Sequence, residues 1–117
     1  MRILLIDEDP ALKKQLSSFL ESHGFEVCSS NDALQALDLV DLSAVDMIIA
    51  DVMAPAVDGV HPLDLLKADP KHKGVPIIVT SSGADEGADL SMRKGAAFCL
   101  PKPIDLDRLL ALVRFAE

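Results

Sequence analysis

The sequence predicts an α/β fold in which a doubly wound, five-stranded parallel sheet is covered by helices on both faces. Five short apolar runs recur along the chain, and the stretches between them carry apolar residues at helical spacing. The chain has 117 residues, of which 50% are hydrophobic, so it matches one domain that can bury its own core. We therefore expect one (βα)5 domain over residues 1–117.

The predicted strands are short and apolar, and the predicted helices differ in how clearly their ends are marked. The strands are Ile3 to Ile6, Phe25 to Cys28, Met47 to Ala50, Ile77 to Val79 and Ala97 to Leu100. Asp9 caps the first helix, which Gly24 ends, and we assign Asp9 no role beyond capping. The second helix is expected to begin at Asn31 or Asp32, and the third to run from about Val60 to Ala68. The fourth would begin after Asp85 and has weak helical character, and the fifth would follow the cap Asp105.

Charge and composition exclude several classes of function. The 11 basic and 19 acidic residues give a net charge of -8, which repels nucleic acid phosphates and anionic lipids. We therefore predict no direct binding to nucleic acid and no membrane association. No apolar stretch approaches the roughly 20 residues that span a bilayer, so a cytoplasmic protein is expected. Cys28 and Cys99 lack metal-ligand spacing and are interpreted as small core residues.

Polar residues that could take part in catalysis or metal binding follow four of the predicted strands. Asp7 and Glu8 follow the first, Asp51 the third, Thr80 the fourth and Lys102 the fifth. In open α/β sheets, ligands bind at the carboxyl ends of the strands. Carboxylates that converge there would raise one another's pKa unless a cation shares the site. Oxygen ligands beside a hydroxyl and an ammonium suit Mg2+ with a phosphoryl group, so we predict a phosphoryl-transfer site.

The chain resembles the receiver domain of two-component response regulators over its whole length. The blocks "LLIDED", "IIADVMAPAVDG", "PIIVTSS" and "CLPKPI" carry the likeness, through their order and their positions at strand ends. The resemblance implies the strand order 2-1-3-4-5. It also implies that Asp51 is the phosphoacceptor, that Thr80 hydrogen-bonds the phosphoryl group and that Lys102 pairs with it. A cis peptide between Lys102 and Pro103 is a further expectation from the family.

The same resemblance implies the cofactor and the partners. Mg2+ would be held by Asp7, Glu8, Asp51 and the backbone carbonyl of Met53, and no other cofactor is expected. A sensor histidine kinase or a histidine phosphotransfer protein would supply the phosphoryl group. Phosphorylation would then change the surface around the fourth helix, the fifth strand and the fifth helix. This surface would bind a protein target that the sequence does not identify, and the domain could also form a homodimer. It would be a signalling domain that catalyses only its own phosphorylation and dephosphorylation.

Three positions depart from the family pattern. His61-Pro62 lies in the first turns of the third predicted helix, where Pro is tolerated only near the helix start because it lacks an N–H. Glu8 stands where a second Asp is more common, and Cys99 stands where an aromatic residue often acts in switching. Phe98 cannot replace that aromatic residue, because neighbouring strand residues point to opposite faces. We therefore expect Thr80 and residues 81–83 to carry the change into the segment after Asp85. The implied strand order also puts Cys28 and Cys99 on opposite edges of the sheet, where they stay unpaired.

Two alternative functions remain open. "LLIDED" also fits the start of a phosphohydrolase of the haloacid-dehalogenase type, with Asp7 as nucleophile and Asp9 as general acid, although Asp51 is then unexplained. A pseudo-receiver would keep the fold as a binding module without phosphorylation. The chain ends at Glu117, where the last predicted helix ends. If the chain is complete, we expect no effector domain and therefore a single-domain regulator or phosphorelay intermediate, whereas a longer open reading frame would overturn this expectation.

Overall fold

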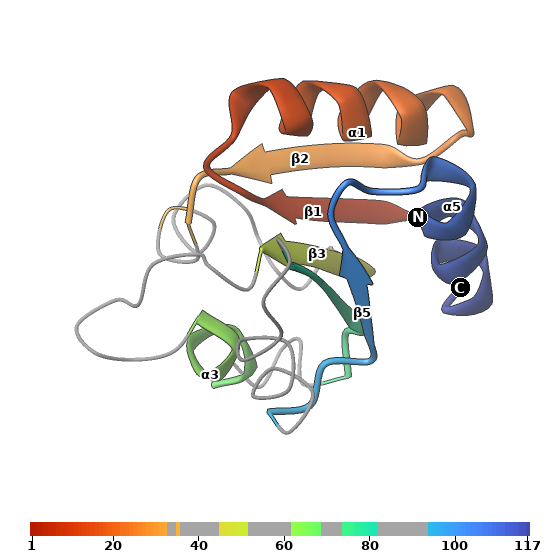
Figure 1. Ribbon diagram of the computed structural model, residues 1–117. Helices are drawn as coiled ribbons and strands as arrows, with labels where there is room; N and C mark the ends of the chain where they lie inside the picture. Colours follow the sequence, from red (N-terminus) through yellow and green to blue (C-terminus); the bar gives the residue numbers. More distant parts are fainter. Residues whose placement is uncertain (33–34, 36–44, 52–61, 69–73, 82–93) are drawn as a thin grey trace.

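The computed structural model of the chain describes residues 1–32, 35, 45–51, 62–68, 74–81 and 94–117. Within them, five parallel strands form one sheet in the order β2-β1-β3-β4-β5 (Figure 1). The predicted fold class and strand order are therefore confirmed. The strands are β1 (Arg2–Ile6), β2 (Glu26–Ser30), β3 (Met47–Asp51), β4 (Ile77–Ser81) and β5 (Phe98–Pro101).

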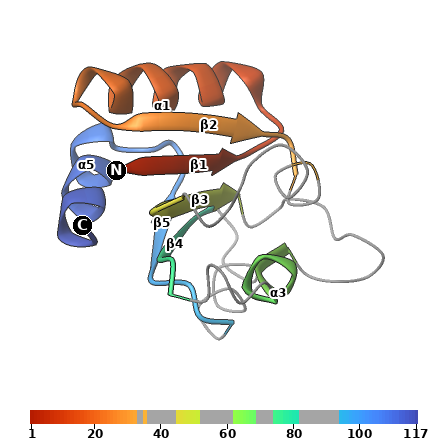
Figure 2. The same cartoon turned by 180° about the vertical axis from the view of Figure 1, so that it is seen from behind.

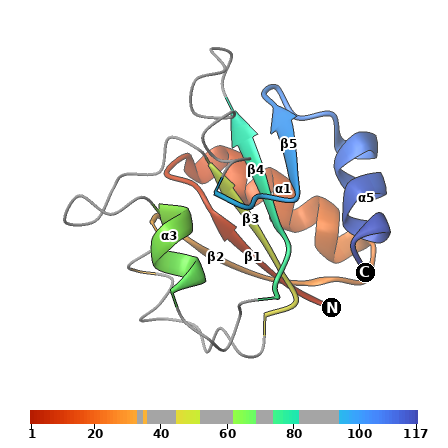
Figure 3. The ribbon, with the colours of Figure 1, turned by 90° about the horizontal axis from the view of Figure 1, so that it is seen from below.

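Helices cover both faces of this sheet. The helices of the described residues are α1 (Pro10–Ser22), α3 (Pro62–Lys67) and α5 (Leu106–Phe115). The first and last of these lie together on one face, and α3 lies on the other (Figures 1 and 3). The helices expected to open near Asp32 and after Asp85 fall largely outside the described residues.

Strand side chains alternate between two cores, because successive residues of a strand point to opposite faces. The core under α1 and α5 takes Ile3, Leu5, Met47, Ile49, Ile78 and Leu100 from the strands. The core under α3 takes Leu4, Ile6, Ile48, Ala50, Ile77 and Val79. This alternation decides on which side of the sheet each residue that follows a strand lies.

The first and last helices begin with the same kind of cap. Asp9 Oδ1 accepts hydrogen bonds from two backbone amides of the first turn of α1, at 3.0 and 3.2 Å. Asp105 Oδ1 accepts the equivalent two bonds at the start of α5, also at 3.0 and 3.2 Å. Both predicted caps are confirmed. After α1, Gly24 has a φ of 90°, a left-handed conformation that favours glycine and ends the helix.

The edge strands extend beyond their predicted ends. β2 begins one residue later than expected and continues to Ser30, which pairs with Ile6 of β1. The backbone makes these ladder bonds, so the polar serines of this edge strand do not end it. β5 likewise begins at Phe98 and includes Pro101, which an edge strand accommodates because its outer amides need no partner strand.

The two cysteines lie on the two edge strands and are free thiols. This confirms the prediction that they lie on opposite edges of the sheet, and their lack of pairing under oxidising conditions stays a prediction. Both Cys28 and Cys99 pack against the core under α3, whereas Phe98 packs against the core under α1 and α5. Phe98 therefore points away from the side of the sheet that Cys99 occupies, as predicted.

The two chain ends of the structure lie on the same side of the molecule, near the amino end of β1 (Figure 2). The carboxyl ends of the strands therefore face away from both ends of the chain. In the part of the chain that the structure describes, no helix has the length and apolar character needed to cross a membrane.

Candidate functional site

Four predicted site residues lie together at the carboxyl ends of the strands and on one side of the sheet. Asp7, Asp51, Thr80 and Lys102 each come two residues after a strand residue that is buried in the core under α1 and α5. Because strand side chains alternate, these four side chains point to the same side of the sheet. Because all the strands are parallel, their carboxyl ends meet at one edge, where ligands of such sheets bind.

An ion cluster forms at this edge around the Lys102 ammonium. Lys102 Nζ lies 3.0 Å from Asp7 Oδ2 and 3.3 Å from Asp51 Oδ2. The side chains of Lys102, Asp7 and Asp51 are exposed by only 21%, 10% and 15%. Water therefore screens these charges much less than it screens ion pairs on the surface. Sequence analysis predicted this grouping, which joins three strands far apart in the chain.

The two carboxylates control the protonation of Lys102. Burial of its ammonium would by itself lower the pKa, because it removes water from the charged form. The hydrogen bond to Asp7 and the negative charges of Asp51 and Asp7 act in the opposite direction and outweigh burial. They hold the pKa of Lys102 above its usual value, so this residue stays a cation at neutral pH.

The Asp7 side chain is fixed at both of its oxygens. Its backbone amide donates to the Ser30 carbonyl at 3.1 Å, which ties the end of β1 to the end of β2. Asp7 Oδ1 accepts a hydrogen bond from the Asp9 amide at 2.9 Å, and Asp7 Oδ2 faces Lys102. The contact with Asp9 was not predicted from the sequence. The signal was available, since an Asp side chain commonly accepts from the amide two residues on.

The backbone of Lys102 is also held near the site. Its amide donates to the Ser81 carbonyl at 2.6 Å, so the residue after β5 is tied to the last residue of β4. The peptide between Lys102 and Pro103 is cis, as the resemblance implied. Sequence analysis gave Ser81 no contact with Lys102, because pairing between the strand ends depends on a register that the residues alone do not specify.

The other predicted site residues differ in their placement. Thr80 is buried and lies directly opposite Asp51 in the register between β3 and β4. Glu8 is exposed. Met53 lies outside the described residues, so the role of its carbonyl stays a prediction.

The donor set at this edge fits Mg2+. Asp7 and Asp51 already direct carboxylate oxygens from neighbouring strands at one shared cation, the Lys102 ammonium. Mg2+ typically takes one or two carboxylates, with waters and phosphate oxygens completing its shell. The described residues contain no group of three or more His, Cys, Asp or Glu side chains placed to hold a metal. Of the predicted ligands, Asp7 and Asp51 direct oxygens at one shared cation, and the parts of Glu8 and of the Met53 carbonyl stay predictions.

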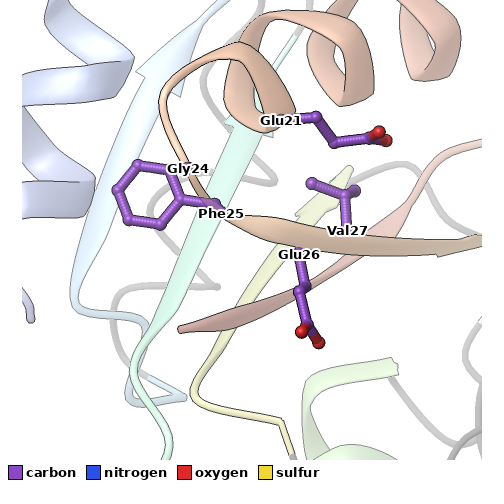
Figure 4. Close-up of a pocket in the computed structure, with 5 residues that line it drawn as sticks. All are labelled: Glu21, Gly24, Phe25, Glu26 and Val27. Carbon is purple, nitrogen blue, oxygen red and sulfur yellow. The ribbon is translucent and has the colours of Figure 1, made fainter.

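An open hollow of about 450 Å³ lies away from this cluster, where α1 ends and β2 begins. Its lining comprises Glu21, Gly24, Phe25, Glu26 and Val27 (Figure 4). It is at the amino end of the strands, and sequence analysis predicted no site there. The hollow and the ion cluster are thus separate features at opposite ends of the sheet.

Comparisons with known proteins agree with the resemblance seen in the sequence. The model of the response regulator receiver domain matches residues 3–114. The transcriptional regulatory protein CpxR of Escherichia coli (strain K12) is 36% identical over 113 residues, which cover 97% of this chain and 47% of CpxR. The DNA-binding response regulator MtrA of Mycolicibacterium smegmatis is 33% identical over 114 residues, which cover 97% of this chain and 49% of MtrA.

Solved structures share the same architecture. The crystal structure of a putative response regulator from Chloroflexus aurantiacus J-10-fl superposes with a TM-score of 0.86. The two chains are 26% identical, and the match covers 98% of this chain and 95% of the other. The receiver fold therefore extends over almost all of this chain.

The relatives correct one prediction. The net charge of -8 led us to predict no direct binding to nucleic acid. The relatives, however, are named as a transcriptional regulatory protein and as a DNA-binding response regulator. The charge argument fails because it describes only these 117 residues, which span about half the length of the curated relatives that they match. A charge summed over one region does not describe binding by another.

Proposed function

Since this chain belongs to the response regulator receiver domain family, we propose that it is a switch that accepts a phosphoryl group on Asp51. The observation that supports this most directly is the pair of partly buried carboxylates, Asp7 and Asp51, gathered around the Lys102 ammonium. A carboxylate beside a fixed cation is able to act as a nucleophile toward phosphorus. The donor in this proposal is a phosphohistidine of a sensor kinase or a phosphotransfer protein.

The transfer exchanges one bond for another. An Asp51 carboxylate oxygen attacks phosphorus, the bond between phosphorus and the histidine nitrogen breaks, and an acyl phosphate forms on Asp51. The released imidazole takes up a proton from water. Lys102 is 3.3 Å from Asp51 Oδ2, so its ammonium is close enough to pair with an oxygen of the group that arrives there.

Mg2+, held by Asp7 and Asp51, would neutralise charge on the phosphoryl oxygens. Asp7 contributes by presenting an oxygen whose direction is fixed by its contacts with Asp9 and Lys102. Thr80 contributes a hydroxyl from the position opposite Asp51 on the neighbouring strand. That hydroxyl is able to donate a hydrogen bond to the new anion.

Phosphorylation from acetyl phosphate tests the proposal. The protein is incubated with acetyl phosphate and Mg2+, and its intact mass is measured. We expect the wild type to gain one phosphoryl group only when Mg2+ is present, and Asp51→Asn to gain none. Asp46→Asn is the matched control, because Asp46 lies just before the same strand at its other end. It should be phosphorylated like the wild type.

Three other outcomes would contradict the assignment. A mass gain that survives Asp51→Asn would place the phosphoryl group on another residue. A gain on Asp7, together with turnover of small phosphoesters, would support the phosphohydrolase alternative. An unchanged mass under all conditions would support the pseudo-receiver.

We further propose that the signal leaves the site through Thr80 rather than through Cys99. Thr80 is buried at the end of β4, and Cys99 packs on the opposite side of the sheet from the ion cluster. With beryllofluoride bound, we expect hydrogen exchange to change mainly between Ser81 and Lys94. Cys99→Ala should keep this response and Thr80→Ala should lose it; the reverse result would contradict the relay.

The output that we propose is control of transcription. This rests on the names of the relatives, a transcriptional regulatory protein and a DNA-binding response regulator. The family match supports a signalling domain over a metabolic enzyme. The role of the chain in this proposal is to convert a charge added at Asp51 into a change of surface.

A further inference from the structure

Two helix caps of this chain are nearly identical, yet within the described residues only one of them touches the ion cluster. Asp9 has a φ of -78° and a ψ of 108°, and Asp105 has a φ of -75° and a ψ of 111°. Their Oδ1 atoms accept the same pair of amide hydrogen bonds at the same distances. The difference is that the Asp9 amide also donates to Asp7 Oδ1 at 2.9 Å.

This extra bond restricts the rotation of the Asp7 carboxylate. The final torsion of an Asp side chain is broad, so one contact would leave its two oxygens free to exchange positions. Here Oδ1 is held by the Asp9 amide while Oδ2 faces Lys102. One oxygen is thereby kept directed at the shared cation.

We propose that Asp9 is a positioning residue for the cation site. Its carboxylate caps α1, the cap fixes the backbone of Asp9, and the fixed backbone directs its amide at Asp7. This inference rests on the proposed function, in which Asp7 is a metal ligand. It goes beyond that function because it gives the third acid of the opening sequence a part in metal binding, although Asp9 does not contact the metal.

The size of the effect follows from how many contacts remain when the cap is removed. In Asp9→Ala the backbone amide is still present, and the following Pro10 keeps the residue extended to some degree. We therefore expect the dissociation constant for Mg2+ to rise by about threefold to tenfold. Loss of a hydrogen-bond partner of a metal ligand typically costs about tenfold to a hundredfold.

The experiment measures Mg2+ binding by the wild type and four variants, through amide NMR shifts at one fixed ionic strength. Asp9→Ala removes the cap and the charge. Asp9→Asn and Asp9→Ser remove the charge but keep a capping oxygen, so their dissociation constants should stay within about twofold of the wild type. Asp105→Ala removes the matched cap of α5. It should lower the melting temperature about as much as Asp9→Ala does, but leave Mg2+ binding within about twofold of the wild type.

Each result either supports or overturns the proposed positioning role of Asp9. Weak Mg2+ binding in Asp9→Ala alone supports the proposal. Equally weak binding in Asp9→Asn would mean that the charge of Asp9 matters and its cap does not, which overturns it. Equally weak binding in Asp105→Ala would mean a general loss of stability, which also overturns it. If the wild type binds Mg2+ and Asp9→Ala binds it equally well, this inference fails while the proposed function stands. If the wild type binds no Mg2+, both fail.

Discussion

The two ends of the parallel sheet each place a basic side chain beside carboxylate groups, and they differ in burial and in the number of carboxylates that the cation faces. At the amino end, the Arg2 amide donates to Asp46 Oδ2 at 2.8 Å, and Arg2 Nε lies 3.5 Å from Glu26 Oε2. The Arg2 and Glu26 side chains are exposed by 44% and 75%, against 10–21% for the three side chains around Lys102. The Arg2 guanidinium therefore pairs with one carboxylate in water, whereas the Lys102 ammonium pairs with two carboxylates that are largely removed from water.

This difference shows why the hollow at the amino end is not the better candidate site. The hollow at the amino end is lined by Glu21 and Glu26, whose carboxylates water can solvate and salt can screen (Figure 4). At the carboxyl end, the charges are close together and poorly hydrated, so each strongly affects the others. Burial of the charged groups, rather than the volume of a cavity, marks the end where chemistry is possible.

The largest expected effect comes from removing the cation of the buried end. Lys102→Met removes the ammonium that pairs with both Asp7 and Asp51, whose side chains are largely buried. We expect the free energy of unfolding in EDTA to fall by about 2 kcal/mol. This is below the about 3–5 kcal/mol typical of a broken, fully buried pair, because these side chains keep some exposure. Urea unfolding measures it.

Excess Mg2+ should recover most of this loss, because a metal ion shared by the two carboxylates replaces the missing charge. Binding to the folded state alone stabilises it by mass action. Mg2+ should therefore stabilise Lys102→Met more than the wild type. An equal loss with and without Mg2+ would mean that Asp7 and Asp51 do not share a cation.

The matched change at the exposed end should have a much smaller effect. Glu26→Gln removes the carboxylate that pairs with Arg2 at 3.5 Å. Exposed ion pairs contribute about 0–1 kcal/mol, so we expect the free energy of unfolding to change by about 0.5 kcal/mol or less. Urea unfolding in EDTA again measures it. A loss as large as that in Lys102→Met would remove the distinction between the two ends.

The fold and the central contacts of the site could be predicted from the sequence for identifiable reasons. The five apolar runs mark buried strands, and the resemblance supplied their order. Asp7, Asp51 and Lys102 each follow such a run, so parallel strands necessarily bring them to one edge. The caps Asp9 and Asp105 were equally visible, because Asp before a helical stripe has a specific chemical reason to be there.

Other features depend on geometry that residue types do not encode. The bond from the Asp9 amide to Asp7 uses a backbone group, and every residue except proline has such a group. The second strand was predicted to end at Cys28, but the backbones of Ser29 and Ser30 also pair with β1 at the edge of the sheet. The charge argument about nucleic acid failed for a different reason, because it described these residues and not the longer relatives.

The smallest expected effect concerns the Cys28 thiol, which reports on the charge of Arg2 at the exposed end. Burial raises the pKa of Cys28 above its ordinary value of 9.0, and the positive charge of Arg2 opposes that rise. The thiol also donates a weak hydrogen bond to the Ile3 carbonyl at 3.6 Å, which only the protonated form can make. The protonated Cys28 thiol thus contributes fully to the free energy of unfolding below pH 9.0. This contribution is lost as the pH rises through the folded-state pKa of the thiol.

Alkylation of Cys28 in a Cys99→Ala background, measured from about pH 7 to 10, tests this balance because only the thiolate reacts. The native chain should react more slowly than the denatured chain, with its midpoint at higher pH. Arg2→Gln should move that midpoint further upward, since it removes the charge that opposes burial. The matched control is Arg108→Gln, which changes an exposed arginine on α5 and should leave the midpoint unchanged. A midpoint unaffected by Arg2→Gln would mean that water screens Arg2 completely, and the contrast between the two ends would then be greater than we propose.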